Sequence, residues 1–372
     1  MTWIWELSDW PRFRFDSGTI AALESLFLRK IGESCGMVKH LGQEDKTSLI
    51  VSLISDEALK TAAIEGEHLN RDSLQSSILR QFGLQTDARR IPAAEQGLAE
   101  MMVDIYRSCG DPLTHDTLFG WHSALTKGRR DLSTIGGYRT QADPMQVISG
   151  PVHKPNIHFE APPSDRVKAE MDTFIAWFNH SAPGCLAPLP ALTRAGIAHL
   201  YFVSIHPFED GNGRIGRAIS EKALAQCIGQ PTLIALAQTI ERHRQAYYAA
   251  LAESNRSLEI TNWLTYFADT VLEATSFTVS RIEFLITRSK FHDRFRDAFN
   301  ERQEKAIARL FEAGPEGFTG GLSARKYMNL TGAPHATATR DLADLVLKGA
   351  LTKTGQLKGT RYFLNLPKPP PQ

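Results

Sequence analysis

The sequence predicts a mainly α-helical protein with two short β-hairpins. Apolar residues recur at helical spacing through much of the chain, whereas β-prone runs next to Gly and Pro stand out in two places, residues 147–159 and 349–364. The helical segments that this spacing predicts are residues 18–40, 46–65, 73–82, 167–178, 192–205, 213–224, 241–253, 300–313, 323–330 and 336–348. A helical fold with small hairpins therefore follows from the pattern.

Composition limits the number of domains and the cellular location. The chain has 372 residues, 42% of them hydrophobic, which is enough for two or three domains with real cores. Its net charge of +1 predicts no strong general attraction to nucleic acid or membrane, and no apolar run reaches the ~20 residues that span a bilayer. The four cysteines are scattered, and no basic region precedes an apolar stretch at the N-terminus. We therefore expect a cytoplasmic protein without a signal peptide or membrane segment.

The most informative segment is His-Pro-Phe-Glu-Asp-Gly-Asn-Gly-Arg-Ile-Gly-Arg at residues 206–217. The preceding residues 192–205 are largely apolar and contain no Pro, so a buried helix should end at His206. A second, amphipathic helix should start near Gly213. The free amides of residues 211–213 and the positive end of that helix would then face an anion.

The residue types in this segment fit a nucleotide-phosphate site. His206 can take a proton near neutral pH, and Asp210 can hold a Mg²⁺ that also binds phosphate oxygens. Arg214 and Arg217 can hold polyphosphate, although cations at a helix N-terminus cost about 0.3–1 kcal/mol each without an anion. That conflict argues for a bound phosphate.

Other readings of the segment fit less well. An EF-hand loop starting at Asp210 would find an acidic twelfth residue in Glu221, but Arg214 and Ile215 stand where an oxygen ligand and the turn Gly belong. A Walker A loop is excluded because the chain contains no Gly-Lys dipeptide. A helical hairpin with a merely polar turn would not require a His and two Arg.

Residues 206–217 resemble the signature of the Fic family, His-Pro-Phe-x-Asp/Glu-Gly-Asn-Gly-Arg-x-x-Arg, with every fixed position filled. The resemblance covers roughly residues 95–274. It includes Gly137-Tyr138-Arg139, residues 146–148 and residues 158–163, which are similar to the family's flap, and the following helix at 167–178. It implies a Fic-type helical core that transfers AMP from ATP to a hydroxyl of a protein, with Mg²⁺ as cofactor.

The resemblance also implies a role for each signature residue. His206 would deprotonate the target Tyr, Thr or Ser hydroxyl, and Asp210 would bind Mg²⁺. The α-phosphate oxygens would be held by Asn212 and the amides of Gly211 and Gly213. The β- and γ-phosphates would be held by Arg214 and Arg217. Phe208 is expected to anchor the loop in the core.

The predicted first hairpin would form the flap over this site. Val147, Ile148 and Ser149 belong to one β-prone run, and residues 157–159 form the other, around Gly150-Pro151. An exposed edge of this hairpin could pair with the backbone of a target protein and so place its hydroxyl. An ordinary surface hairpin is the alternative.

A second motif lies upstream, at Thr61-Ala-Ala-Ile-Glu65-Gly66. It closes a helix that Ser55 could cap, with Asp56 and Glu57 in the first turn and Gly66 as the stop. The motif is similar to the inhibitory Ser/Thr-x-x-x-Glu-Gly/Asn of Fic proteins, in which the Glu pairs with the second Arg of the signature, here Arg217. Glu65 would then deny Arg217 to the γ-phosphate. The alternative is that Glu65 is a solvated carboxylate near a helix end.

Aromatic residues outside the motifs have two readings. Tyr247 and Tyr248 could contact the adenine or pack in the core. Trp3, Trp5 and Trp10 fit core anchors better than a ligand cage.

The C-terminal pattern of three helices and a hairpin, residues 300–366, resembles a winged helix-turn-helix. DNA could bind through residues 323–361, with the third helix in the major groove and cations of the hairpin on phosphates. Asp341 and Asp344 weaken that case, and such modules also serve as protein-docking or dimer modules.

These readings give a domain plan and competing functions. The plan is a helical region with the inhibitory helix at 1–92, a catalytic core at 93–275, a connecting helix at 276–299, the winged helix at 300–366 and a disordered tail at 367–372. We expect a self-inhibited protein adenylyltransferase whose partners are ATP and a hydroxyl-bearing protein, self-modification included. A homodimer, a DNA-binding regulator with a nucleotide-sensing core, and an enzyme that removes AMP remain alternatives.

Overall fold

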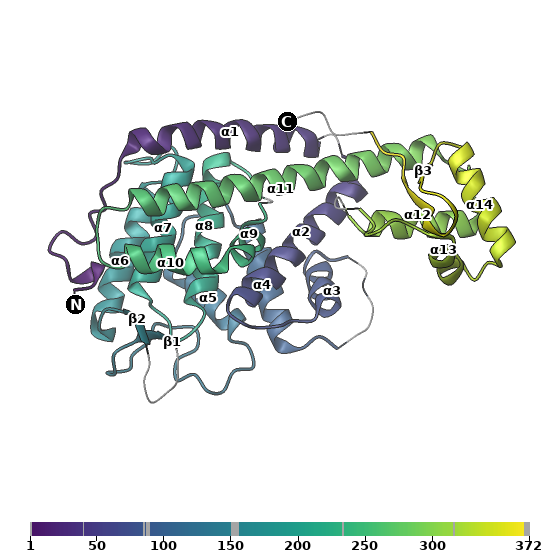
Figure 1. Cartoon of the computed structure of the whole chain (residues 1–372). Coiled ribbons are helices and arrows are strands. Elements are labelled where there is room, and N and C mark those ends of the chain that lie inside the picture. Colours follow the sequence, from purple (N-terminus) through teal and green to yellow (C-terminus); the bar gives the residue numbers. More distant parts are fainter. Residues whose placement is uncertain are drawn as a thin grey trace. The chain divides into compact units, whose positions relative to one another are not determined.

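The computed structural model describes residues 2–39, 41–84, 86, 90–149, 156–232, 234–314 and 317–367. It divides into two compact units, Met1–Cys35 with Lys46–Thr278, and Gly36–Asp45 with Val279–Gln372. The predicted mainly helical fold with two small hairpins is confirmed (Figure 1). Within the described residues no helix is both long and apolar enough to cross a membrane. The five-part domain plan stays a prediction, and residues 368–372 of its tail lie outside the described part.

The first unit contains most of the helices and one hairpin. Helices α1 and α2 begin or end just outside this unit, and α11 continues beyond it. Its elements are η1 (Ile4–Glu6), α1 (Ser17–Lys39), α2 (Gln43–Ile64), α3 (Arg71–Gln81), α4 (Ala93–Arg107), α5 (His115–Leu125), β1 (Gln146–Ser149), β2 (Asn156–Glu160), α6 (Ser164–His180), α7 (Ala191–Ile205), α8 (Asn212–Ile228), α9 (Leu236–Arg242), α10 (Arg244–Ser254) and α11 (Thr261–Arg294).

Helix α7 forms the centre of the first unit. All of its residues except Val203 are buried, as expected for a helix that is apolar on every face. Helix α8 lies beside it (Figure 1), and the loop between the two carries residues 206–211. The predicted buried helix ending at His206 is therefore confirmed.

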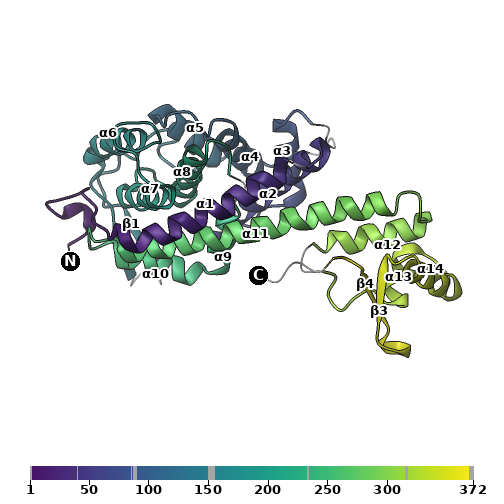
Figure 2. The same ribbon diagram turned by 90° about the horizontal axis from the view of Figure 1, so that it is seen from above.

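A carboxylate from α1 fixes the start of α7. Glu24 accepts hydrogen bonds from the backbone N–H groups of Leu192 and Thr193 at 3.1 and 2.8 Å, and from the Thr193 hydroxyl at 2.9 Å. These donors have no partner within their own helix, so the buried carboxylate satisfies them and complements the helix dipole. Helix α1 also lies along α11 (Figure 2), where Lys30 Nζ donates to Ser276 Oγ at 2.6 Å.

The N-terminal tryptophans are packed against the first unit. Trp5 Nε1 donates to the Glu160 carbonyl at 2.7 Å and so ties the segment to β2. Trp10 meets Tyr201 of α7 edge-on, with ring centroids 5.1 Å apart. Trp3 is buried against Phe159. All three are anchors, which agrees with the preferred reading of the sequence.

The hairpin β1–β2 is antiparallel, with Val147 opposite Phe159 and Ile148 opposite Ile157. A register shift lies between Val147 and Ile148. The predicted turn at Gly150-Pro151 lies outside the described residues, and so does the side chain of Ser149.

The second unit has its own core, built from α12 (Glu301–Glu312), α13 (Ala324–Thr331), α14 (His335–Leu347), β3 (Leu351–Thr354), η2 (Leu357–Gly359) and β4 (Arg361–Leu364). Asn300 and Gln303 form a reciprocal capping box at the start of α12. Strands β3 and β4 pair antiparallel, with Leu351 opposite Leu364. Three helices followed by a hairpin is the predicted winged-helix order.

Two local expectations need correction. Ser55 does not cap a helix, because α2 begins twelve residues earlier at Gln43 and the Ser55 hydroxyl donates back to Val51 O at 2.6 Å. The predicted helix at 241–253 is broken at His243, whose φ of −112° and ψ of 33° separate α9 from α10. Sequence periodicity continues across His243, so it gives no sign of that break.

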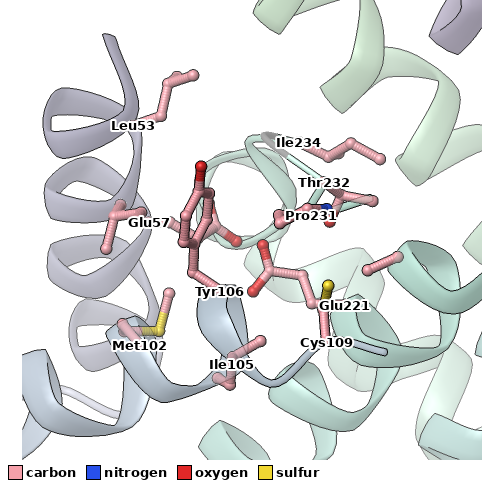
Figure 3. A pocket seen from close by; sticks show the side chains of 12 residues that line it. Leu53, Glu57, Met102, Ile105, Tyr106, Cys109, Glu221, Pro231, Thr232 and Ile234 are labelled. Carbon is pink, nitrogen blue, oxygen red and sulfur yellow. The ribbon is translucent and has the colours of Figure 1, made fainter. Parts of the chain in front are cut away.

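Because α2 continues through Ser55, Glu57 does not lie in a first turn, and its side chain is in the core. A cavity of about 30 Å³, room for one or two waters, lies among residues of α2, α4 and α8. Figure 3 shows the carboxylates of Glu57 and Glu221 pointing toward one another inside it. Glu57 is 6% exposed; one oxygen accepts from the Ala237 N–H, and the other has no hydrogen-bond partner among the residues that the structure describes.

Two facing carboxyls in such a cavity cannot both be ionised at low cost. Burial raises the pKa of Glu57 to about 8, and burial together with the charge of Glu57 raises the pKa of Glu221. An unfolded Glu ionises near 4.3. The stability that the protonated pair contributes is therefore present below that value and is lost as the pH rises toward about 8.

We expect Glu221→Gln to stabilise the chain at pH 8 by about 1–2 kcal/mol, because the amide keeps the shape and removes an ionisable group from the cavity. The gain should shrink toward pH 5. Urea unfolding from pH 5 to 8.5, with exposed Glu33→Gln as the matched control, measures it. A variant that is less stable than the natural chain at every pH would contradict this account.

Candidate active site

The site begins with the backbone at the end of α7. His206 has φ 52° and ψ 57°, a left-handed conformation that costs a non-glycine residue roughly 1–2 kcal/mol. Its N–H still donates to Phe202 O at 3.0 Å, which closes the helix. Phe208 is fully buried and stacks on His122 with ring centroids 4.3 Å apart, as the sequence predicted for an anchor.

Arg139 holds this strained turn in place. Its Nε donates to the His206 carbonyl at 2.8 Å, its backbone N–H donates to Pro207 O at 2.9 Å, and Nη2 donates to Pro162 O. The side chain is 2% exposed and its partners are all backbone carbonyls. A buried cation that satisfies carbonyls of two separate segments, residues 205–207 and Pro162, rigidifies the loop at the position of the imidazole.

The imidazole of His206 is held as a neutral base. Burial and, to a lesser extent, the nearby charge of Arg139 together lower the pKa of His206 to about 4. Nδ1 lies 3.3 Å from Val203 O, a contact that suits the tautomer with hydrogen on Nδ1. Nε2 is then a proton acceptor at neutral pH.

The turn at residues 208–212 is pinned by Asn212. Its Oδ1 accepts from the Phe208 N–H at 2.9 Å and its Nδ2 donates to the Phe208 carbonyl at 2.8 Å. Gly211 has φ 82° and starts α8, so the amides at the helix N-terminus follow directly. The Gly211 N–H is used by Asp210 Oδ1 at 2.6 Å. Asn212 therefore shapes the loop, and its expected role toward phosphate stays a prediction.

Asp210 is an ionised carboxylate between two guanidiniums. It accepts from Arg129 Nη1 at 2.6 Å and from Arg214 Nη2 at 3.3 Å. Burial alone would raise the pKa of Asp210, but Arg214 and Arg129 hold it below the usual value. Mg²⁺ is often bound by one or two carboxylates plus phosphates and waters, so a single Asp fits the expected metal. Across the described ranges no cluster of three metal-ligand residues forms.

The predicted pairing of Glu65 with Arg217 is present in the structure. Glu65 Oε1 accepts from Arg217 Nη2 at 2.8 Å. Thr61 holds the same guanidinium, through its carbonyl at 3.0 Å and its hydroxyl at 2.7 Å. The Arg217 side chain is 4% exposed, so this ion pair is much less screened than a surface pair.

The carboxylate of Glu65 lies on the first turn of α8. A Cβ placed on Gly213 would lie 2.4 Å from Glu65 Oε1, so only Gly leaves room for it. Glu65 thus occupies the kind of position at a helix N-terminus that a phosphate would take. Two buried donors, Arg217 Nη1 and Arg214 Nε, have no partner in the described part of the chain. An anion larger than one carboxylate would satisfy them.

A pocket of about 490 Å³ opens beside these groups, within the range of small-molecule sites. It brings together predicted residues from five segments, namely Glu65, Val147, Ile148, His206, Gly213, Tyr247 and Tyr248. Tyr247 is buried with its hydroxyl 2.8 Å from His199 Nε2, and the Tyr248 hydroxyl donates to Ile64 O at 3.2 Å. Contact of either ring with a nucleotide base stays a prediction.

Four contributors to the site were not assigned a role from the sequence: His122, Arg129, Arg139 and Glu67. Arg139 stood within the segment that resembles the flap, but nothing in the pattern linked it to His206. Glu67 lies two residues after Glu65 and accepts from Arg214 Nη1 at 2.7 Å. His122 and Arg129 reach the loop through the fold, and no local sequence pattern marks them.

We expect Arg139→Met to raise the pKa of His206, because a nearby positive charge is lost, and to destabilise the first unit by about 2–4 kcal/mol through unpaired carbonyls. Histidine-selective NMR titration reads the pKa, with His206→Gln to identify its signal. Urea unfolding reads the stability, and Arg166→Met, an exposed Arg, is the control. An unchanged His206 pKa in a folded Arg139→Met protein would contradict the role of this charge.

Comparison with known proteins identifies relatives of the segment that carries the site. Residues 112–224 match the model of the Fic/DOC family, and residues 3–84 match a domain of unknown function, DUF4172. The protein adenylyltransferase Fic of Drosophila melanogaster is 30% identical over 154 residues, which are 39% of this chain and 30% of that protein. The uridine 5'-monophosphate transferase of Xanthomonas campestris pv. campestris is 33% identical over 120 residues, 31% of this chain and 21% of that protein. The chain thus spans under a third of these relatives.

Solved structures share the fold. A Fic family protein from Desulfovibrio desulfuricans G20 aligns with a TM-score of 0.55 at 20% identity, over 95% of this chain and 98% of that one. A Fic domain containing signaling protein from Bacteroides thetaiotaomicron aligns with a TM-score of 0.51 at 18% identity, over 71% of this chain and 98% of that one. Residues 112–224 of the chain are thus a Fic/DOC-family region, preceded by residues 3–84 that match DUF4172.

Proposed function

We propose that the protein transfers AMP from ATP to a hydroxyl side chain of a protein. The observation that carries this proposal is the neutral base His206 beside the N-terminus of α8, where Arg214 and Arg217 converge. A nucleotide sensor would need the arginines but would have no use for a base held unprotonated. The family relation adds support, since two of its relatives are a protein adenylyltransferase and a uridine 5'-monophosphate transferase.

In the proposed reaction, Nε2 of His206 takes the proton of the target hydroxyl as its oxygen bonds to the α-phosphorus. The bond from that phosphorus to the bridging oxygen breaks, and pyrophosphate leaves. Arg214 and Arg217 bind the departing phosphates, and the amides at the start of α8 stabilise charge on the α-phosphate. Mg²⁺ held by Asp210 would neutralise phosphate charge. The protein supplies positioning and electrostatics, as phosphoryl-transfer sites commonly do.

The same proposal makes Glu65 a brake. Its carboxylate holds Arg217 and lies against Gly213, so ATP cannot place its γ-phosphate there while α2 is docked. Removing the carboxylate would free one buried guanidinium for phosphate. Hydrogen bonds to charged groups are worth about 1.5–3 kcal/mol, which corresponds to roughly a tenfold effect or more.

Transfer of UMP is the second candidate, and the Xanthomonas campestris relative is the observation that favours it. The catalytic steps at phosphorus are the same for either nucleotide, because the adenine or uracil ring lies away from the reacting atoms. Removal of AMP from a modified hydroxyl, with Glu65 orienting water, would use the same pocket. These three reactions differ in the labelled product.

The transfer reaction is tested with ATP or UTP carrying a labelled α-phosphate, with Mg²⁺, added to the protein alone and to a cell lysate. We expect little label with the natural chain, at least about tenfold more with Glu65→Gly, and a loss of about 10²–10⁴-fold in Glu65→Gly/His206→Ala. Exposed Glu33→Gln is the control. No label from either nucleotide in a folded Glu65→Gly protein that binds ATP would overturn the proposal.

The pH profile tests the base separately. A group with a folded pKa of about 4 is neutral from pH 8 down to about pH 5, so the rate constant of Glu65→Gly should stay level there and fall only below that range. An ordinary histidine would show the fall near pH 6.5. Single-turnover rates at saturating ATP, measured between pH 4.5 and 8.5, show the pH at which the rate constant falls. A midpoint near 6.5 would show that His206 is not held neutral in the working enzyme.

For the C-terminal module, residues 300–366, we propose duplex DNA as the partner. Residues 323–361 contain seven Lys and Arg and two Asp. Both Asp face α12: Asp341 accepts from Arg302 Nε at 2.9 Å, and Asp344 accepts from Gln303 Nε2 at 2.8 Å. The objection that these carboxylates would repel phosphate therefore loses its force, while Arg340 of α14 is exposed.

We expect the full chain to bind labelled duplex DNA with an affinity that falls steeply with salt, and Arg340→Ala/Lys353→Ala to reduce the salt slope by about two. Fluorescence anisotropy between 50 and 250 mM salt measures this, with Arg296→Ala/Lys305→Ala as the charge-matched control. Sedimentation of the protein alone tests the homodimer alternative. If both double variants bind DNA with equal affinity and equal salt dependence, Arg340 and Lys353 are not part of a DNA-binding surface.

A further inference from the structure

Glu67 makes a second contact between the segment after α2 and the signature helix α8. Its Oε2 accepts from Arg214 Nη1 at 2.7 Å. The Arg214 side chain is 4% exposed and that of Glu67 is 38% exposed, so a buried guanidinium meets a carboxylate at the rim of the site. Glu67 lies outside the Thr61-to-Gly66 motif, and no role for it follows from residue order alone.

The backbone after α2 explains why two carboxylates reach the same helix end. Gly66 has φ 83°, and the Glu67 N–H donates back to Ala62 O at 3.0 Å while the Gly66 N–H donates to Ala63 O at 3.0 Å. This pair of bonds is the Schellman closure of a helix, which needs the left-handed residue that Gly provides. The chain reverses at Gly66, so Glu65 and Glu67 both face α8.

The two carboxylates engage different arginines. Glu65 holds Arg217, whereas Glu67 holds Arg214, which also donates to Asp210 at 3.3 Å. Both terminal nitrogens of Arg214 therefore donate to carboxylates, Nη1 to Glu67 and Nη2 to Asp210. The buried Nε of Arg214 has no partner among the described residues. A phosphate that approached Arg214 would meet Glu67 first.

We propose that Glu67 is a second inhibitory carboxylate, which blocks phosphate binding at Arg214 independently of the block that Glu65 imposes at Arg217. This inference rests on the proposed function, in which Arg214 binds the β-phosphate and Arg217 binds the γ-phosphate. Removing Glu65 alone then relieves inhibition at Arg217 but leaves phosphate binding at Arg214 blocked by Glu67. Full release requires that the segment 65–67 withdraw as a whole.

An inhibitory role for Glu67 predicts changes in the affinities for ADP and ATP, whereas a purely structural role does not. A contact that only pins the loop would change stability and leave nucleotide affinity alone. A carboxylate on the β-phosphate position repels ADP and ATP alike, because both carry that phosphate. A carboxylate on the γ-phosphate position discriminates against ATP more than against ADP.

The test is calorimetric titration of ADP and of a non-hydrolysable ATP analogue, with Mg²⁺, into the full natural chain, Glu65→Gly, Glu67→Gln and the double variant. We expect Glu67→Gln to tighten both nucleotides by about 10- to 150-fold, which corresponds to the about 1.5–3 kcal/mol of a hydrogen bond to a charged group. Glu65→Gly should tighten the ATP analogue more than ADP. The two effects should multiply in the double variant, since they concern separate guanidiniums.

Glu100→Gln is the matched control, because Glu100 also forms a partly exposed ion pair, with Lys127 at 2.9 Å, away from the arginines of α8. Glu67→Ala is the second variant, and circular dichroism confirms that each protein is folded. If Glu65→Gly binds nucleotide more tightly while Glu67→Gln and Glu67→Ala match the natural chain, the second brake is overturned and the proposed function stands. If no variant binds either nucleotide, the proposed function fails and the inference fails with it.

Discussion

The left-handed turn at His206 is the constraint on which the rest of the site depends. It ends α7, turns the chain out of the core and leaves only five residues before α8 begins. A short loop between two packed helices can adopt few conformations, so the imidazole and the first turn of α8 have fixed relative positions. Contacts on both sides of His206 maintain its strained backbone conformation. Arg139 donates to the His206 carbonyl, and Phe208 stacks on His122.

Positive charge accumulates at the start of α8. Two arginines at the positive end of a helix are unfavourable, and the sequence alone suggested that an anion must compensate them. The structure supplies three carboxylates for this purpose, Asp210 from the loop and Glu65 and Glu67 from the segment after α2. The chain thus satisfies its own anion site internally. A polyphosphate ligand must compete with carboxylates that are covalently part of the protein, and their effective concentration is high.

How much the sequence could predict depends on how local each feature is. The loop 206–217 is contiguous, so its turn and the two helices that flank it could be predicted from residue order. The pairing of Glu65 with Arg217 joins positions 152 residues apart, and only the family resemblance suggested it. Arg129 and His122 reach the loop through tertiary packing that leaves no pattern in sequence. The helix expected at 46–65 begins close to the observed start of α2, but the suggested cap at Ser55 put Glu57 in a first turn, whereas Glu57 lies buried within α2.

The carboxyl pair in the cavity lies on the same two helices as the brake. Glu57 precedes Glu65 by two turns on α2, and Glu221 follows Arg217 by one turn on α8, with Tyr106 and Cys109 of the adjoining segment lining the same cavity. Any movement that separates α2 from α8 would bring both carboxyls into water, where they ionise near pH 4.3. Such a movement at neutral pH would release protons, so its free energy would depend on proton concentration.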